Sequence, residues 1–268
     1  AKNGAKVILA EDKPRFGGSL LTSEVNIGNQ SGKEWADKII TELKGMPNVT
    51  VKNRAQVFGY YDHNMLVMSE RLTEHLPKSN KYTPKQKLWY IRAKEVVISS
   101  GSIERPLVFG NNDTPGVLLS SAAKEYLKIY GVIVGKKPLI FTNNDSAYET
   151  AIEFKKNGID PIVLDSRKEL SSDLIDEAKN LNIKIKFEHV VVNANGYRKV
   201  KSADIAKISD DKTTLGKIEK IECDCICVSG FWTPTIHLAS QSGGKTKFSK
   251  EIDAFLPDQS KQNETTVG

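Results

Sequence analysis

The sequence predicts an α/β protein built from two tandem βαβ units, and three observations indicate this. A short apolar strand at 6–10 ends in the acidic residue Glu11. Another apolar strand at 138–142 precedes a helical pattern that stops at Gly158, and a third strand follows at 161–165. Alternating, strand-like segments follow each unit. This order is typical of two Rossmann-like dinucleotide-binding domains with inserted β-layers, as in FAD/NAD-linked, disulfide-reductase-like oxidoreductases.

The first unit is expected to be truncated at its N-terminus. Residues 1–18 read as the second half of a dinucleotide-binding unit, without the first strand and the glycine-rich loop. In a complete unit, the acidic residue that ends the second strand accepts hydrogen bonds from ribose hydroxyls and repels a 2′-phosphate. Glu11 holds that position and indicates NAD or FAD rather than NADP, although an acid that merely ends a strand remains the alternative. Gly17 and Gly18 permit close approach of the backbone to a ligand, but glycine pairs also mark ordinary turns.

The elements of the first unit follow from periodicity. A helix is predicted at 34–44, with Trp35, Ile39 and Leu43 on one stripe and Gly45 just past its end. The strands predicted after it are 49–51, 55–61, 65–71, 87–93 and 96–100.

The second unit has an unusual turn between its first strand and its helix. Residues 142–146 contain no glycine, and Asp145 brings a negative charge to the helix N-terminus, so this unit is not expected to bind a dinucleotide in the usual manner. Ser146 and Glu149 fit a capping box. Ala147, Ala151 and Phe154 form the predicted inward stripe of the helix. A helix at 172–181, a strand at 183–187, a β-meander at 190–208 and a strand at 223–229 are predicted after it.

We expect three segments in the domain organisation. Residues 1–134 form the first dinucleotide-binding domain, residues 135–245 the second, and residues 246–268 a truncated return toward the first.

Composition excludes several classes of function. The 268 residues are 39% hydrophobic and 27% charged with a net charge of +6, but the lysines are scattered. The denser run at 78–87 fits a solvated loop better than a nucleic-acid site. No apolar stretch has the roughly 20 residues that span a bilayer, and the N-terminus is not a signal peptide, so we expect a cytoplasmic protein without nucleic-acid or membrane partners.

The cysteines and histidines indicate neither a metal site nor a catalytic site. Cys223, Cys225 and Cys227 alternate along one strand, so all three thiols are expected to point to the same face as small apolar groups. Zinc sites prefer C-x₂-C spacing, and the four histidines form no ligand motif. No cysteine lies near the segment 17–21, which excludes a self-sufficient disulfide reductase. No Ser/His/Asp set or carboxylate pair has catalytic spacing, so no catalytic residue is assigned.

A set of motifs in the same order along nearly the whole chain resembles one family, the alpha subunit of heterotetrameric sarcosine oxidase. The matching stretches are 7–12, 16–21, 57–64, 104–109, 111–117, 141–148, 228–234 and 237–245. The resemblance implies that this chain is an internal part of a subunit that holds NAD in its first dinucleotide-binding domain. It also implies beta, gamma and delta subunits as partners, with FAD and FMN in or at the beta subunit.

The complex that the resemblance implies oxidises sarcosine to glycine and hydrogen peroxide. A folate domain later in the alpha subunit, absent from this chain, would bind tetrahydrofolate and capture the one-carbon unit as methylenetetrahydrofolate. Because oxidation in that family belongs to the beta subunit, this chain is expected to contain no oxidative catalytic residue. By itself it is expected to be inactive and to bind NAD poorly.

The resemblance also implies the residues that contact the cofactor. Glu11, with Asp12 beside it, would contact the ribose, and Gly17, Gly18 and Ser19 would form the loop of close approach. Val57 would lie beside the adenine, Ser100 and Gly101 would form a turn that passes the dinucleotide, and Arg105 would meet a phosphate or brace the turn. No metal ligand is implied.

Two other functions stay open on the sequence. One is the cofactor-binding subunit of a related amine, proline or opine dehydrogenase, which would hold FAD or ATP in the same cleft. The other is a non-catalytic scaffold with unused nucleotide sites, which the glycine-free second turn supports.

Overall fold

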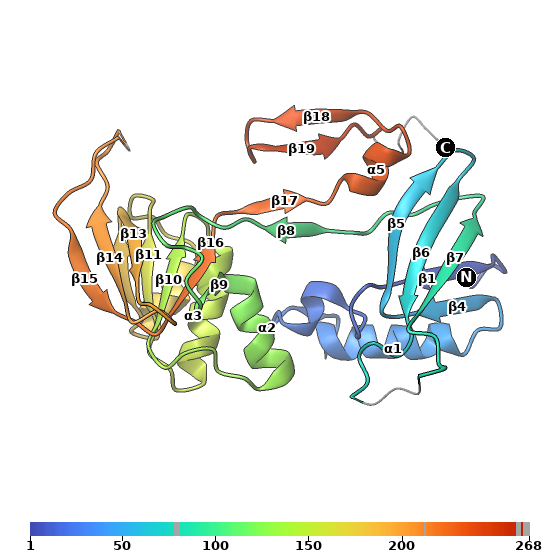
Figure 1. The fold of residues 1–268 in the computed structure, drawn as a ribbon, viewed down its shortest axis with the longest axis horizontal. Helices are drawn as coiled ribbons and strands as arrows, with labels where there is room; N and C mark the ends of the chain where they lie inside the picture. The colour runs from blue at the N-terminus through green and yellow to red at the C-terminus, as the bar shows by residue number, and fades with distance from the viewer. Residues whose placement is uncertain (78–80, 212, 261–263, 265–268) are drawn as a thin grey trace. The chain divides into compact units, whose positions relative to one another are not determined.

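The computed structural model describes residues 1–77, 81–211, 213–260 and 264, and it confirms the α/β class. The chain divides into two compact units. Unit 1 comprises residues 1–102 and 234–268, and unit 2 comprises residues 103–233 (Figure 1). Of the basic run at 78–87, residues 78–80 lie outside the described part, as do 261–263 and 265–268 of the expected C-terminal segment.

In the structure, the boundary between the units falls between residues 102 and 103. The physical reason is that residues 117–130 are built into the second unit. Strand β9 (Val117–Leu119) joins its sheet by pairing with β16 (Cys225–Ser229), and helix α2 (Ser120–Tyr130) packs on helix α3 (Ser146–Lys156). Neither β9 nor α2 was predicted from the sequence pattern.

Unit 2 is built around a parallel sheet of five strands in the order β12-β11-β10-β16-β9. The remaining strands are β10 (Pro138–Thr142), β11 (Ile162–Asp165) and β12 (Lys184–Phe187), close to their predicted positions. Strand β10 pairs in parallel with both β11 and β16. Because all five strands are parallel, their carboxyl ends lie along one edge, where α/β sheets bind ligands.

The two faces of this sheet bury different cores, as the period of two along a strand requires. Ile140, Val163 and Cys227 pack with helices α3 and α4 (Asp173–Asn180). Leu139 and Leu164 pack instead with an antiparallel meander. The meander comprises β13 (His189–Asn195), β14 (Ser202–Lys207) and β15 (Glu219–Glu222). Figure 1 shows the sheet between the meander and helices α2 and α3.

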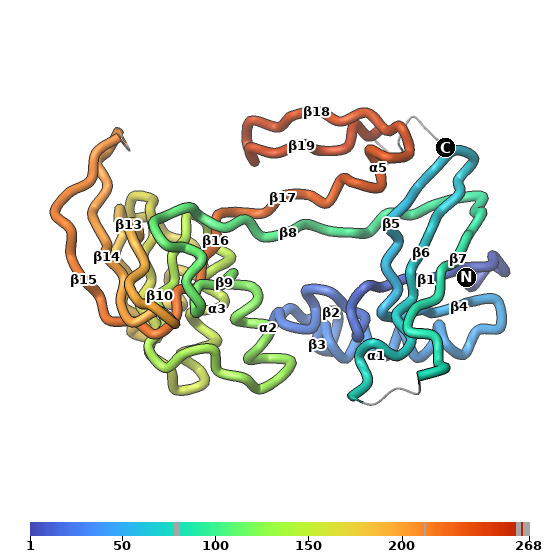
Figure 2. The backbone as a smooth tube through the Cα atoms, viewed as in Figure 1, coloured from blue at the N-terminus to red at the C-terminus, as the bar shows by residue number. Residues whose placement is uncertain are grey.

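Unit 1 begins with a parallel pair, β1 (Val7–Ala10) and β4 (Val49–Lys52), connected through helix α1 (Gly32–Lys44). The side chain of Ser31 accepts a hydrogen bond from the Glu34 N–H and the Glu34 carboxylate accepts one from the Ser31 N–H, which forms a capping box. This cap starts α1 two residues before its predicted start. Figure 2 traces the short segments that precede it, the 3-10 helix η1 (Gly18–Leu21) and the hairpin of β2 (Asn26–Ile27) and β3 (Gln30–Ser31).

The inserted β-layer of unit 1 is an antiparallel sheet of β5 (Ala55–Tyr61), β6 (Met65–Arg71) and β7 (Gln86–Arg92), as predicted. The described part of residues 234–268 contributes helix α5 (His237–Gln241), which packs on β5, and a hairpin of β18 (Thr246–Ser249) and β19 (Ala254–Pro257). Where the chain passes between the units, β8 (Ser102–Glu104) pairs with β17 (Trp232–Pro234).

Three predictions of local structure are wrong. Residues 96–100 form no strand, and Val97 is 88% exposed, because an apolar run becomes a strand only where backbone partners meet it. The capping box of Ser146 and Glu149 does not form, because Asp145 is the N-cap residue and Ser146 is already helical. Cys223 lies before β16 begins and packs on the meander side, whereas Cys225 and Cys227 pack on the helix side.

Candidate functional site

Glu11 lies directly after β1, and both of its backbone groups are fixed by neighbouring strands. Its N–H donates to the Lys52 carbonyl at 2.9 Å, and its carbonyl accepts from the Ala55 N–H at 2.8 Å. The half-buried side chain turns back, so that Oε1 accepts a hydrogen bond of 2.9 Å from the Lys13 N–H. Burial raises the pKa of Glu11 above its ordinary value. The acidic residue is thus held rigidly at the end of its strand.

The loop after Glu11 is tied to β5 and β6. Arg71 on β6 donates to the backbone carbonyl of Asp12 through Nη2, and the Arg54 N–H donates to the Lys13 carbonyl at 3.1 Å. Arg71 was not predicted as a site residue, because only the folded register of β6 brings it to this loop. The Asp12 side chain is exposed.

Gly17 and Gly18 form a tight, left-handed turn into η1. Their φ angles of +123° and +52° are strained for residues with a side chain, and a Cβ atom at Gly17 would lie 3.0 Å from the Leu21 side chain. The Ser19 carbonyl accepts hydrogen bonds from the N–H groups of Thr22 and Ser23 at 3.1 and 2.9 Å. Gly18 and Ser19 are exposed. A Cβ atom at Gly18 would meet nothing within 4 Å, so the backbone is open to a ligand at Gly18, whereas Gly17 faces the side chains of Leu21 and Ala36.

Val57 lies on β5 just beyond the contact between β5 and the end of β1. Val57 is half-buried. It lies two residues after Ala55, whose N–H donates a hydrogen bond to the Glu11 carbonyl. The pairing of β5 with β6 shifts register between Val57 and Gly59. Glu11, Asp12 and Val57 therefore belong to one neighbourhood of unit 1, and Gly17–Ser19 continue the loop that leaves it.

The other three predicted site residues lie elsewhere. The Ser100 hydroxyl donates to the Thr235 carbonyl at 2.9 Å, and the Gly101 carbonyl accepts from the Thr235 N–H at 2.9 Å. Arg105 belongs to unit 2, where its backbone bonds to Phe231 and Gly230 and its guanidinium lies 5.9 Å from the centre of the Phe231 ring. These contacts support bracing of a turn for Arg105.

The turn after β10 in unit 2 is filled by the side chain of Asn144, which is only 6% exposed. Its Nδ2 donates to the carbonyl and the hydroxyl of Ser229 at the end of β16, at 3.2 and 3.1 Å. Its Oδ1 accepts from the N–H and the hydroxyl of Ser146 at 3.1 and 2.6 Å. Asn144 therefore satisfies the Ser146 N–H, one of the two backbone groups that the predicted capping box was expected to satisfy.

A network of charges follows the end of β11. Asp165 is 0% exposed and receives hydrogen bonds from the Tyr148 hydroxyl at 2.9 Å and from Nε and Nη2 of Arg167 at 3.0 and 2.8 Å. Arg167 also reaches Asp145 at 2.7 Å. Burial, and then the Asp165 charge, raise the pKa of Tyr148. Burial alone would lower the pKa of Arg167, but its hydrogen bonds to the two carboxylates raise it.

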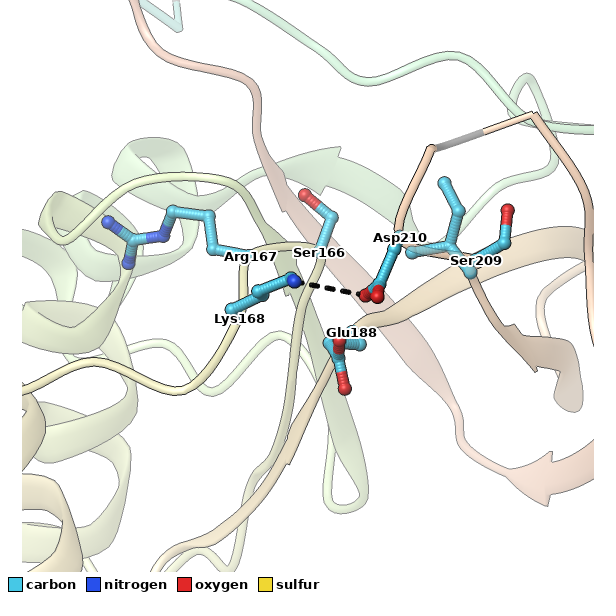
Figure 3. A pocket seen from close by; sticks show the side chains of 7 residues that line it. Ser166, Arg167, Lys168, Glu188, Ser209 and Asp210 are labelled. Carbon is cyan, nitrogen blue, oxygen red and sulfur yellow. Dashed lines mark ion pairs between the residues drawn. The ribbon is translucent and has the colours of Figure 1, made fainter.

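A cavity of about 260 Å³ lies beside this network, and none of the predicted site residues lines it. Its lining residues are Ser166, Arg167, Lys168, Glu188, Ile208, Ser209 and Asp210. Figure 3 shows Lys168 directed at Asp210, with the ions 3.1 Å apart, while Arg167 runs away from that pair. Glu188 pairs with Lys207 at 3.1 Å. The charged side chains of Lys168, Glu188 and Asp210 that line the cavity are thus each paired with a side chain of opposite charge.

The cysteines are buried free thiols, as predicted. Burial raises the pKa of Cys223 to about 12. In the part of the chain that the structure describes, no group of three or more His, Cys, Asp or Glu side chains could hold a metal ion. Among the same residues, no helix has both the length and the apolar character needed to cross a membrane.

Solved structures share this fold. The chain aligns with L-proline dehydrogenase from P. horikoshii at a TM-score of 0.64 and 20% identity, over 96% of this chain and 43% of that one. It aligns with T. acidophilum thioredoxin reductase at a TM-score of 0.70 and 15% identity, over 100% and 81% of the two chains. The two tandem Rossmann-like domains predicted from the sequence are thereby confirmed as a fold.

Comparison with curated sequences gives relatives along the whole chain, whereas no protein-family model matches it. Sarcosine oxidase subunit alpha of Corynebacterium sp. (strain P-1) is 34% identical over 272 residues, which cover 100% of this chain and 28% of the relative. The subunit of the same name from Rhizobium meliloti (strain 1021) is 36% identical over 254 residues, which cover 94% and 24%. Over the segment that it spans, about a quarter of the length of these relatives, the chain belongs to the family of sarcosine oxidase alpha subunits.

Proposed function

We propose that this chain holds NAD in unit 1, as part of the alpha subunit of a sarcosine oxidase complex. The observation that carries the proposal is the position of Glu11 at the carboxyl end of β1, with its backbone fixed on both sides and its carboxylate half-buried. An acid at that position accepts hydrogen bonds from ribose hydroxyls. The turn at Gly17 and Gly18 follows it in the chain, and the open space at Gly18 favours a ligand close to the backbone.

The residues assigned to the cofactor have distinct tasks in this proposal. Glu11 orients the ribose, Gly17–Ser19 give the cofactor access to backbone N–H groups, and the backbone of Val57 lies beside the adenine. Asp12 lies next to Glu11 with its carbonyl engaged by Arg71, which keeps the loop in place. Ser100 and Gly101 would line the dinucleotide, and Arg105 would brace a turn.

The complete complex would oxidise sarcosine to glycine and hydrogen peroxide, with the one-carbon unit passed to tetrahydrofolate. We place the oxidative step outside this chain, in a beta subunit with FAD and FMN, and the folate site in another part of the alpha subunit. Gamma and delta subunits would complete a cytoplasmic heterotetramer. This chain then contributes cofactor binding and contains no oxidative catalytic residue. Relatives named as sarcosine oxidase alpha subunits, which match 100% and 94% of this chain, support the assignment of the chain to that subunit.

The test replaces Glu11 by Ala in the complete complex. Loss of charge-assisted hydrogen bonds to the ribose costs about 1.5–3 kcal/mol, so we expect the dissociation constant of NAD to rise about 10-fold to 150-fold. The measurement is calorimetric titration of complex that has been depleted of nucleotide.

The matched control is Glu42→Ala, which removes an exposed carboxylate on α1 that pairs with Lys2 in the same unit. This control should bind NAD like the unaltered complex. Equal NAD affinity of the Glu11→Ala variant and this control would contradict the assignment of the ribose contact.

A further inference from the structure

The carboxyl edge of the sheet in unit 2 is where a second dinucleotide would bind. In a doubly wound sheet, the pyrophosphate lies at the N-terminus of the helix after the first strand, and the ribose lies at an acidic residue after the next strand. In this chain those two positions correspond to the start of α3 and to Asp165 at the end of β11. Both are already in contact with side chains of the chain itself.

At the pyrophosphate position, Asn144 replaces the ligand's hydrogen bonds. Its Oδ1 accepts from the Ser146 N–H at the first residue of α3, an amide that would otherwise face a phosphate oxygen. Its Nδ2 reaches across to Ser229 on β16, so the amide group bridges the end of β16 and the start of α3 and cannot swing aside without losing contacts on both sides. Trp232 adds a hydrogen bond of 2.9 Å from Nε1 to the Ser146 hydroxyl.

At the ribose position, Arg167 replaces the ligand's hydroxyls. The guanidinium donates to Asp165 through Nε and Nη2, and the Arg167 N–H donates to Oδ1 of the same carboxylate at 2.9 Å. The Tyr148 hydroxyl takes another position on Asp165. The carboxylate is completely buried, and these donors occupy both of its oxygens.

The charges at this edge also disfavour a phosphate. Asp145 at the N-terminus of α3 is negative, and Arg167, the cation between the two turns, is shared by Asp145 and Asp165. A dinucleotide would have to break these ion pairs and place its phosphates beside Asp145, which costs more than the helix N-terminus returns.

We propose that Asn144 and Arg167 are internal ligands, which occupy the pyrophosphate and ribose positions of unit 2 and close this edge of the sheet to dinucleotides. The inference concerns unit 2 alone and does not depend on NAD binding in unit 1. By this inference, Asn144 and Arg167 are the residues that prevent unit 2 from binding a nucleotide.

The test is hydrogen–deuterium exchange of the full alpha subunit with NADH, NADPH or FAD at millimolar concentration. In the unaltered protein we expect no change in exchange of peptides that cover 142–148 and 165–168. Protection of these peptides by any of the three nucleotides would overturn the proposal. Peptides that cover 7–21 report separately on unit 1, so failure of the proposed NAD site is distinguishable from failure of this inference.

A gain-of-binding variant tests the two side chains directly. Asn144→Gly combined with Arg167→Ser restores a glycine to the turn and frees Asp165, so NADH should now protect the 142–148 peptide. The control Lys168→Ser removes a neighbouring positive charge that pairs with exposed Asp210, and it should gain nothing. A folded double variant without any gain would overturn the proposal.

Asn144→Gly alone provides a second route if the double variant does not fold, because it keeps all the ion pairs of Arg167. Inorganic pyrophosphate is then the probe for the released Ser146 amide. Protection of that amide in the variant and not in the unaltered protein is expected. Equal exchange with and without pyrophosphate in the variant would contradict the role of Asn144.

Discussion

Replacing Arg167 by Met removes the guanidinium that serves the most buried carboxylate of unit 2. Asp165 is 0% exposed and, among the described residues, would keep the Tyr148 hydroxyl and one backbone N–H as donors. Breaking a buried ion pair by removing one partner costs about 3–5 kcal/mol. Because the Arg167 side chain is 26% exposed, water can replace part of its contact, so we expect the low end, about 3 kcal/mol.

Urea denaturation followed by tryptophan fluorescence measures this loss. Trp232 is the tryptophan of unit 2, so a background with Trp35 and Trp89 replaced by Phe makes the signal specific. The control Lys168→Met breaks an exposed pair with Asp210 and should cost less than about 1 kcal/mol.

A double-mutant cycle with Asp165→Asn separates the pair from general damage to the fold. The cost of the two changes together should be smaller than the sum of the single costs by about 1–3 kcal/mol. Additive costs, or an Arg167→Met variant as stable as the Lys168→Met control, would refute the reasoning.

Three further predictions concern other parts of the chain. Ser31→Ala removes the capping box of α1 and should lower the unfolding free energy of unit 1 by about 1 kcal/mol in a urea titration. The three buried thiols should not react with a disulfide reagent at pH 8 in the native protein, and all three should react after denaturation. Burial raises the pKa of Glu11, so the folded state favours the protonated carboxyl. The contribution of this group to the free energy of unfolding is complete below the ordinary pKa of 4.5 and is lost as the pH rises through the raised pKa. As the pH increases through this range, the unfolding free energy of Glu11→Gln should therefore rise relative to that of the unaltered protein. Urea titrations at several pH values measure this difference.

The parts of the fold that were predictable have strong local patterns. The β10-α3-β11 unit combines two apolar runs with the stripe of Ala147, Ala151 and Phe154, and all three side chains are completely buried. Glu11 was predictable as the end of β1 because the apolar run stops there. In these segments, local preference and tertiary packing agree.

The parts that were not predictable depend on partners far away in the sequence. Ser146 has the spacing of a capping residue, but Ser229 lies 83 residues away and holds Asn144 in the position from which it accepts the Ser146 N–H. Arg167 lies two residues from Asp165, but its ion pair with Asp145 spans 22 residues and could not be predicted from the local sequence. Residues 96–100 have the composition of a strand, but strand formation requires a neighbour that composition does not reveal.

The most direct test of the central claim is the identity of the nucleotide released when the complete complex is denatured. Mass spectrometry of the released material should show NAD, and complex with the Glu11→Ala substitution should release much less of it after dialysis. FAD without NAD, ATP in place of NAD, or no nucleotide from an intact alpha subunit would contradict the account.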